Sequence, residues 1–241
     1  MGGLGNNIFQ IAYGTYLQEN GYNVRYNSIL LRRNLFTRFL RWSIHPCVVS
    51  DLFPNETFVY QQEAIPMFIG LLQKKLRITA ESSSVYVSSM QQNIDYAKNL
   101  FGYYQFPDLW KQVVIKALHK KVQHVYSSRP SQPLIHLRFG DRVWAAESEY
   151  RSFHLLRLSA EYQEFLVSTD DNFAARDILK HHGIKNGVIL KKGVLQEFIA
   201  MLNSIDLVAD NSTLSWTAAR LNRNANNCSA PNYITHLLGD V

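Results

Sequence analysis

The stretch LIHLRFGD, residues 134–141, begins with an apolar run of strand length and ends in a charged turn. The runs EFLVS at 164–168, GVIL at 187–190 and LVA at 207–209 are also short and apolar, and each is followed by polar residues. Short apolar runs bounded by polar turns are typical of strands that are buried on both faces. We therefore expect buried strands at residues 134–138 and 164–168, and strands at residues 187–190 and 207–209.

Helical patterns separate these expected strands. Residues 173–182 and 214–221 are predicted to be helical, and Leu195, Phe198, Ile199 and Leu202 fall on one helical face at i, i+3, i+4 and i+7. Strands that alternate with helices imply a parallel sheet, because parallel neighbours need a crossover connection. The sequence therefore predicts an α/β fold with a parallel sheet in this half of the chain.

The first half of the chain is less regular. The glycine-rich turn Gly2-Gly3-Leu4-Gly5-Asn6 precedes a helical pattern at residues 7–19. Residues 127–133, SSRPSQP, are rich in serine and proline, which is typical of a linker. We therefore expect two domains, at residues 1–126 and 134–241.

The composition limits the class of protein and its partners. The 241 residues are 46% hydrophobic and 18% charged, which excludes a disordered or collagen-like chain. No apolar stretch reaches the roughly 18 residues of a membrane-spanning helix, and no secretory signal is visible, so we expect a cytoplasmic protein. The net charge of +6 favours anionic partners such as nucleotide phosphates. No nucleic-acid-binding motif accompanies the charge, so we expect no nucleic-acid partner.

Two segments of the first half combine basic and apolar side chains. Residues 29–42 interleave four arginines with leucine, phenylalanine and tryptophan, and residues 67–78 are a weaker version. These segments could be helices that cover a core and leave their cations in water. They could also hold the chain against an anionic membrane surface, which would make it a peripheral membrane protein.

Polar turns follow three of the expected strands, after Arg138, Ser168 and Ala209. Parallel α/β sheets bind ligands at the carboxyl ends of their strands, so these turns are the candidate site. Strand alternation places His136 and Arg138 on one face. The guanidinium could bind a diphosphate and stabilise it as a leaving group, and the imidazole could donate to a phosphate or sugar oxygen. Asp141 could orient the arginine, although a structural arginine–aspartate pair would give the same pattern.

Other turns carry further candidate ligand groups. Asp170 and Asp171 could bind a metal, accept hydrogen bonds from guanine or ribose, or cap the helix that follows. The hydroxyls within residues 210–215 could bind phosphate together with helix N–H groups, or act as simple N-caps. The N-terminal glycines could let the backbone approach an anion at the start of a helix. No other acidic or histidine cluster in the sequence supports a metal site.

Four segments resemble, in this order, the α-1,2-fucosyltransferases of glycosyltransferase family 11, especially the bacterial members that build surface polysaccharides. Residues 2–14, GGLGNNIFQIAYG, resemble the family segment GGLGNQMFQYA, and residues 101–105, FGYYQ, resemble its FGYFQ-type segment. HLRFGD at 136–141 resembles the motif HxRRxD, and DNSTLSWTAA at 210–219 resembles NSTFSWWAA.

The resemblance implies a GT-B-like fold, in which two Rossmann-like domains face a central donor cleft. It implies inverting transfer of L-fucose, or a related 6-deoxy sugar such as colitose, from a GDP-sugar without a metal or another cofactor. The implied acceptor is a hydroxyl of a glycan, on a lipid-linked O-antigen or a similar surface polysaccharide, joined in α-1,2 linkage. Such an enzyme would work in the cytoplasm, at the inner face of the cell membrane.

The resemblance also implies roles for individual residues. Arg138 would bind the donor's diphosphate and assist its departure, His136 would position the phosphate or the sugar, and Asp141 and Asp171 would be alternative candidate bases. The implied donor-binding residues are Gly3, Gly5, Asn6, Asp170, Asp171, Asn211, Ser212, Thr213 and Ser215. Phe139 stands where the family has a second arginine, which removes a positive charge near the diphosphate. The alternative hypothesis is therefore a catalytically impaired relative that only binds a nucleotide-sugar or a glycan.

Overall fold

The computed structural model describes residues 3–27, 48–59, 84–86, 99–101, 105–127, 131–140, 145–232 and 234–235. Contacts between residues divide the chain into two compact units, Met1–Lys121 and Val122–Val241. The basic, apolar segments at 29–42 and 67–78 and the candidate Asp141 lie outside the described residues. None of the helices in the described ranges is both long and apolar enough to cross a bilayer.

The N-terminal unit contains a long helix and short strand pairs. Its described elements are α1 (Leu4–Glu19), β1 (Tyr26–Asn27), α3 (Val49–Leu52), β2 (Phe58–Val59), β3 (Ser84–Tyr86), β4 (Asn99–Phe101), the 3-10 helix η2 (Pro107–Leu109) and α5 (Gln112–Lys121). β1 pairs with β2 and β3 pairs with β4, both in parallel.

Helix α1 begins one turn earlier than the sequence pattern indicated. The predicted start at residue 7 is wrong because Leu4 and Ile8, at i and i+4, lie on one buried stripe and extend the helix upstream. Gly3 is the N-cap, so Gly5 and Asn6 lie inside the first helical turn and not in a loop before it.

A close approach fixes how β1 meets α1. The Oη of Tyr26 donates a hydrogen bond to the carbonyl oxygen of Ile11 at 3.3 Å. A Cβ built on Gly14 would lie 2.1 Å from that Oη, so any larger residue would displace the tyrosine. At the same helix, Phe9 packs edge-to-face on Trp110 with ring centroids 5.3 Å apart.

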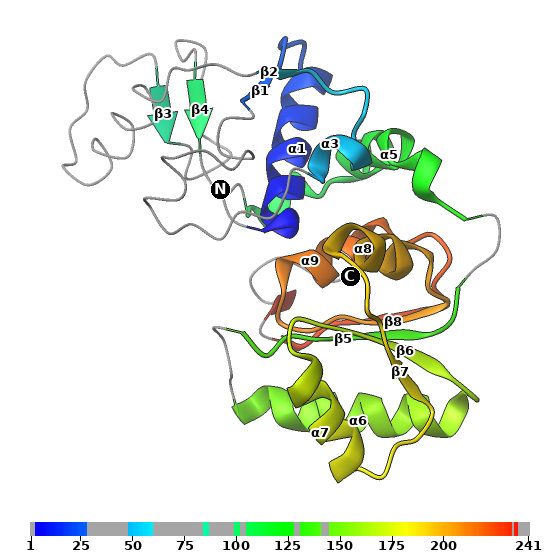
Figure 1. Cartoon of the computed structure of the whole chain (residues 1–241). Helices are drawn as coiled ribbons and strands as arrows, with labels where there is room; N and C mark the ends of the chain where they lie inside the picture. The colour runs from blue at the N-terminus through cyan, green and yellow to red at the C-terminus, as the bar shows by residue number, and fades with distance from the viewer. Residues whose placement is uncertain are drawn as a thin grey trace. The chain divides into compact units, whose positions relative to one another are not determined.

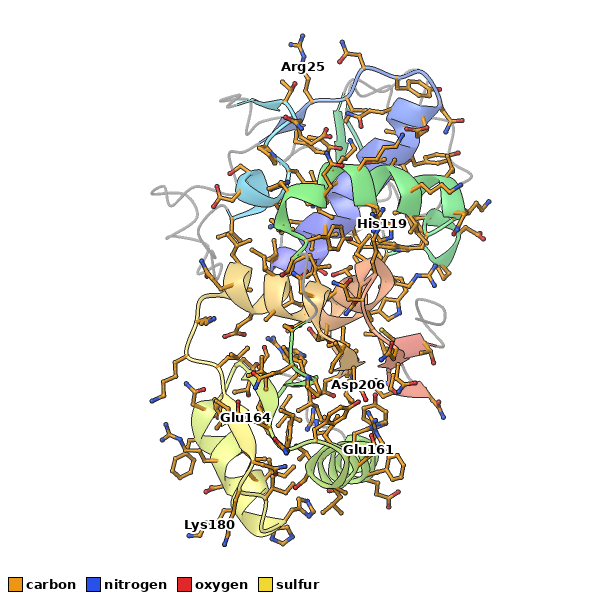
Figure 2. All side chains as sticks on the ribbon, turned by 90° about the vertical axis from the view of Figure 1, so that its right-hand side faces the viewer. Arg25, His119, Glu161, Glu164, Lys180 and Asp206 are labelled. Carbon is orange, nitrogen blue, oxygen red and sulfur yellow. The ribbon has the colours of Figure 1, made fainter. Side chains whose placement is uncertain are left out.

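The C-terminal unit is a parallel sheet covered by helices on both faces (Figure 1 and, turned by 90°, Figure 2). Its described elements are η3 (Gln123–Val125), β5 (Leu134–Leu137), α6 (Ala145–Glu161), β6 (Phe165–Thr169), α7 (Asn172–His181), β7 (Gly187–Ile189), α8 (Val194–Asn203), β8 (Asp206–Val208), α9 (Thr213–Leu221) and β9 (Asn227–Ser229). The described strands form one five-stranded sheet in the order β7-β6-β5-β8-β9. Helices α6 and α7 cover one face, and α8 and α9 cover the other. This is the doubly wound order of Rossmann-like folds, so the predicted α/β parallel sheet is confirmed.

The central strand β5 is buried along its whole length because both faces of the sheet are covered. Ile135 and Leu137 join the core cluster beneath α6 and α7, which also contains Leu155, Leu158, Phe165, Val167, Ala175, Leu179 and Val208. Since side chains alternate along a strand, Leu134 and His136 face the side of α8 and α9.

Most predicted elements of this unit are confirmed. The four predicted strands correspond to β5, β6, β7 and β8 within one residue at each end. The predicted helices correspond to α7, α8 and α9. Helix α6 and strand β9 were not predicted. Two residues of the predicted linker also bond within this unit: the N–H groups of Ser127 and Ser131 donate to the side-chain and backbone oxygens of Asn203 at 2.6 and 2.7 Å.

Candidate functional site

The candidate site lies at the carboxyl ends of β5, β6 and β8, where the three polar turns come together. β5 pairs with β6 on one side and with β8 on the other. The chain leaves β5 towards α6 on one face of the sheet and leaves β8 towards α9 on the opposite face (Figure 1). Adjacent strands whose connections diverge in this way form a topological switch point, where open α/β sheets bind their ligands.

A buried ion pair holds the backbone of Arg138 at this point. Oδ2 of Asp210 accepts the backbone N–H of Arg138 at 2.6 Å and the Nε–H of Arg151 at 2.8 Å. Nη2 of Arg151 donates to the carbonyl oxygen of Arg138 at 2.5 Å. The two paired side chains are only 5% and 1% exposed. Both backbone groups of Arg138 are therefore fixed by charged partners, which orients its side chain.

The guanidinium of Arg138 remains accessible and is paired with Asp170. Nη1 of Arg138 lies 3.1 Å from Oδ2 of Asp170, and the arginine side chain is 38% exposed. Asp170 also accepts the backbone N–H groups of Phe139 at 2.8 Å and Gly140 at 3.0 Å. A Cβ on Gly140 would lie 2.8 Å from Oδ2 of Asp170, so a larger residue there would displace that carboxylate. The turn after β6 thus shapes the turn after β5.

Helix α9 begins directly beside this loop. Ser212 is its N-cap, and its Oγ accepts the N–H of Leu214 at 3.2 Å. Oδ1 of Asp210 accepts the N–H of Asn211 at 2.8 Å, so one carboxylate joins the start of α9 to the backbone of Arg138. Ser215 is fully buried, and its Oγ lies within hydrogen-bonding distance of the N–H and the carbonyl of Asp210. The partial positive charge of the α9 N-terminus therefore lies near the arginine.

His136 is buried two residues before Arg138, on the same face of β5. Burial lowers the pKa of His136 to about 4, although the neighbouring carboxylates of Asp210 and Asp170 oppose this shift. The imidazole is consequently neutral at pH 7. Among the described residues, its Nδ1 has no hydrogen-bond partner. A neutral imidazole can exchange a hydrogen bond with a ligand but adds no charge to the site.

A half-buried acid lies on the same face of the sheet. Oγ of Ser168 donates to Oε2 of Glu197 at 2.8 Å, and Ser168 is the register partner of His136. Burial raises the pKa of Glu197, and the charge of Asp170 raises it further, against the hydrogen bond from Ser168. Sequence reasoning missed Glu197 because its only local signal is an acid in the first turn of α8.

The structure brings most of the predicted site residues of the C-terminal unit together. Those at the carboxyl ends of β5, β6 and β8 are His136, Arg138, Asp170, Asn211, Ser212, Thr213 and Ser215. Asp171 instead caps α7, where its Oδ1 accepts the N–H groups of Phe173 and Ala174 at 2.9 and 3.0 Å.

The remaining predicted residues lie in the N-terminal unit, at the start of α1. They are Gly3, Gly5 and Asn6. Oδ1 of Asn6 accepts a hydrogen bond from Nε2 of Gln105 at 2.9 Å. One described residue from each of two segments that carry the family resemblance is therefore joined to the other inside the N-terminal unit.

Phe139, which replaces the second arginine of the family motif, packs against the core. It is partly buried against the cluster beneath α6 and α7, and the centroid of its ring lies 5.2 Å from the Cζ atom of Arg151. The positive charge at this turn therefore comes from the side chain of Arg138, while Arg151 is neutralised by Asp210. Sequence reasoning missed Arg151, whose position in a long polar helix carries no motif.

No group of three or more histidine, cysteine, aspartate or glutamate side chains in the described ranges is placed to hold a metal ion.

No family model matches the sequence. No curated protein matches it either. Among solved structures, the chain is similar to a crystal structure of POFUT1 in complex with GDP, with 11% identity and a TM-score of 0.33 over 84% of this chain and 69% of that one. A likeness at this level establishes neither the fold nor an activity.

Proposed function

We propose that the C-terminal unit binds the diphosphate of a GDP-sugar and that the chain transfers the sugar to a glycan hydroxyl. The observation that carries this proposal is the accessible guanidinium of Arg138 at the switch point of the sheet, beside the N-terminus of α9. A guanidinium matches the geometry of phosphate oxygens, and helix N-termini favour anions. Together they can hold two phosphate groups without a metal.

The same arrangement supports a displacement at the anomeric carbon. In this step the acceptor oxygen forms a bond to that carbon while the bond to the diphosphate breaks, and the electron pair leaves with GDP. Arg138 and the N–H groups of α9 stabilise the charge that develops on the leaving diphosphate. The acceptor's proton passes to water, and the configuration at the carbon inverts.

The family resemblance supplies the finer part of the proposal. On that basis the donor is GDP-L-fucose or a related 6-deoxy sugar, the linkage is α-1,2, and a second Rossmann-like domain completes a GT-B-like enzyme. The acceptor is then a surface glycan such as a lipid-linked O-antigen. The resemblance rests on the segments at 2–14, 101–105, 136–141 and 210–219.

The decisive experiment measures nucleotide binding by calorimetry, with GDP, UDP and CMP and with or without EDTA. We expect GDP to bind selectively and EDTA to have no effect. Arg138→Ala should weaken GDP binding by about tenfold or more, since it removes hydrogen bonds to a charged group. Lys192→Ala is the matched control because Lys192 is an exposed cation of the same unit, outside the site. Equal GDP affinity in the wild type and Arg138→Ala would refute the proposed site.

Phe139 favours a second candidate function, a relative that binds the donor without transferring the sugar. The family's second arginine is absent at this position, and the ring packs into the core. Transfer and hydrolysis assays with GDP-fucose over a panel of galactoside acceptors separate the two candidates. Binding of GDP-fucose with no product from any acceptor would favour the binding protein, and a fucosylated product would exclude it.

A further inference from the structure

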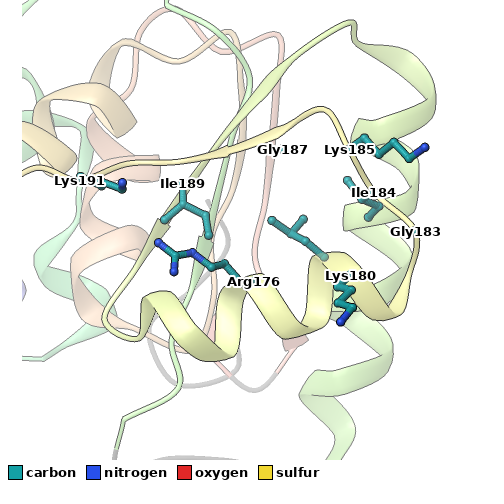
Figure 3. Close-up of a pocket in the computed structure, with 9 residues that line it drawn as sticks. Arg176, Lys180, Gly183, Ile184, Lys185, Gly187, Ile189 and Lys191 are labelled. Carbon is teal, nitrogen blue, oxygen red and sulfur yellow. The ribbon is translucent and has the colours of Figure 1, made fainter.

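A pocket lies at the edge of the C-terminal sheet, between α7 and β7 (Figure 3). Its volume is about 590 Å³, and it is lined by Arg176, Leu179, Lys180, Gly183, Ile184, Lys185, Gly187, Ile189 and Lys191. Three lining residues belong to α7, namely Arg176, Leu179 and Lys180 at i, i+3 and i+4, and two belong to β7, namely Gly187 and Ile189 two positions apart, so each set lies on one face of its element. The two faces converge on one groove.

The end of α7 shapes one end of this groove. Gly183 has φ of +66°, and the chain closes the helix with bonds from the N–H of Ile184 to the carbonyl of Leu179 and from the N–H of Gly183 to the carbonyl of Lys180. This Schellman arrangement satisfies helix-end carbonyls and turns Ile184 and Lys185 back beside the helix.

The floor of the groove is apolar. Leu179 belongs to the core cluster, and Ile184 and Ile189 pack against that cluster but stay partly exposed. Gly187 adds no side chain, and a Cβ there would lie 3.0 Å from both Leu179 and Phe165. Aliphatic surface is therefore open to a ligand at the base of the groove.

The rim of the groove is cationic. Figure 3 shows Arg176 and Lys191 at one end, near Ile189, and Lys180 and Lys185 at the other, near Ile184. All four cations are exposed, and none forms an ion pair within the part of the chain that the structure describes. Four unpaired cations around one groove repel one another, and a bound anion would relieve that repulsion.

We propose that this groove binds an amphiphilic phosphate, which is a phosphate or diphosphate ester of an aliphatic alcohol. Arg176 and Lys191 hold the phosphate, since arginine binds it bidentately and lysine supplies a second charge. The aliphatic chain lies on Leu179, Ile184 and Ile189, and its burial adds affinity in proportion to the area covered. The volume lies within the range of small-ligand pockets.

This proposal does not rest on the proposed donor site. The groove adjoins the edge strand β7, whereas Arg138 follows the central strand β5. None of the residues that line the groove is a proposed donor-site residue. Failure of GDP binding and failure of binding at the groove are therefore separate results.

The test measures binding of octyl phosphate, below its micelle concentration, to the full chain by calorimetry. We expect saturable binding at least about tenfold tighter than that of inorganic phosphate or octanol, because both parts of the ligand are used. Arg176→Glu and Lys191→Glu should each weaken binding about fivefold or more. Lys192→Glu is the matched control: it reverses the charge of the neighbouring lysine, which does not line the groove.

Three results would overturn the proposal. They are unchanged affinity in the Arg176→Glu/Lys191→Glu double variant, equal binding of inorganic and octyl phosphate, and binding only to vesicles of anionic phospholipid and not to monomeric octyl phosphate. The last result would assign the cations to a membrane surface. Thermal unfolding of each variant confirms that it is folded, which is expected because the substituted side chains are exposed.

Discussion

Replacing Asp210 by asparagine tests whether the buried ion pair with Arg151 holds the site together. Asp210 accepts N–H groups from Arg138, Arg151 and Asn211, and it is 1% exposed. Asparagine keeps the size of the side chain but offers only one acceptor oxygen. In Asp210→Asn the amide NH2 group would face N–H donors, and the guanidinium of Arg151 would be buried without a counter-charge.

The structure sets the size of the expected loss. Removing one partner of a buried ion pair costs about 3–5 kcal/mol, because the other charge stays buried and uncompensated. Asparagine retains one hydrogen bond, so we expect the lower end, about 3 kcal/mol. That is a large part of the roughly 5–15 kcal/mol by which domains are stable. Because the backbone of Arg138 loses its anchor, GDP affinity should fall as well.

Urea unfolding, followed by circular dichroism, measures this loss. With a denaturant slope of about 2 kcal/mol per molar, the midpoint should fall by about 1.5 M. Glu161→Gln is the matched control, because Glu161 is half exposed in its pair with Arg157 and should contribute under about 0.5 kcal/mol. Adding Arg151→Met to Asp210→Asn should recover part of the stability by removing the unpaired charge. A loss below about 1 kcal/mol, or strictly additive variants, would refute this account of the pair.

Two further predictions follow from buried titratable groups. Burial lowers the pKa of His136 from 6.5 to about 4, so between these values the unfolded chain binds a proton that the folded chain does not. The free energy of unfolding should therefore fall as the pH drops through this window, by about 3 kcal/mol in all. In urea titrations, His136→Gln should remove that part of the pH dependence. Burial and the charge of Asp206 raise the pKa of the Cys228 thiol to about 11. In a Cys47→Ser background, Cys228 should therefore react slowly with a thiol reagent at pH 8 and rapidly once urea unfolds the chain, and fast reaction of the native chain would contradict the raised pKa.

The fold of the C-terminal unit could be predicted where the spacing of the apolar residues and the polar residues of the flanking turns indicate the same element. Strands β5, β6 and β8 are short apolar runs that are mostly buried, and helix α8 has a full apolar face, so local pattern and final environment coincide, whereas the apolar run of β7 lies at the sheet edge with Val188 exposed. Helix α6 escaped prediction because its inner face is partly polar. Arg151 and His154 are buried there, 4% and 9% exposed, which breaks the apolar spacing that marks a helix. Its polar residues have a tertiary reason, since Arg151 pairs with Asp210.

The turns that form the candidate site could be predicted from the sequence, but the residues that hold those turns in place could not. Arg138, Asp170 and the start of α9 follow strand ends, and the switch point brings strand ends together. Arg151 could not be found, because its partner lies 59 residues away in the chain and no local pattern indicates the contact. The role of Asp171 was ambiguous in the sequence, since a carboxylate before a helix can cap it or bind a ligand; in the structure it caps α7.

The charge balance of the site leads to one more prediction, for Asp170→Asn. Arg138 is paired with Asp170 at 3.1 Å, so a diphosphate must compete with that carboxylate for the guanidinium. Removing the carboxylate's charge should tighten GDP binding several-fold. The free energy of unfolding should fall by about 1 kcal/mol, because asparagine can accept only one of the N–H groups of Phe139 and Gly140. Calorimetry with GDP at two salt concentrations measures the first effect, and urea unfolding measures the second. Weaker GDP binding in Asp170→Asn would show instead that the carboxylate contacts the nucleoside or holds the loop in its binding form. The pair with Asp170 would then serve to position Arg138 and not to balance its charge.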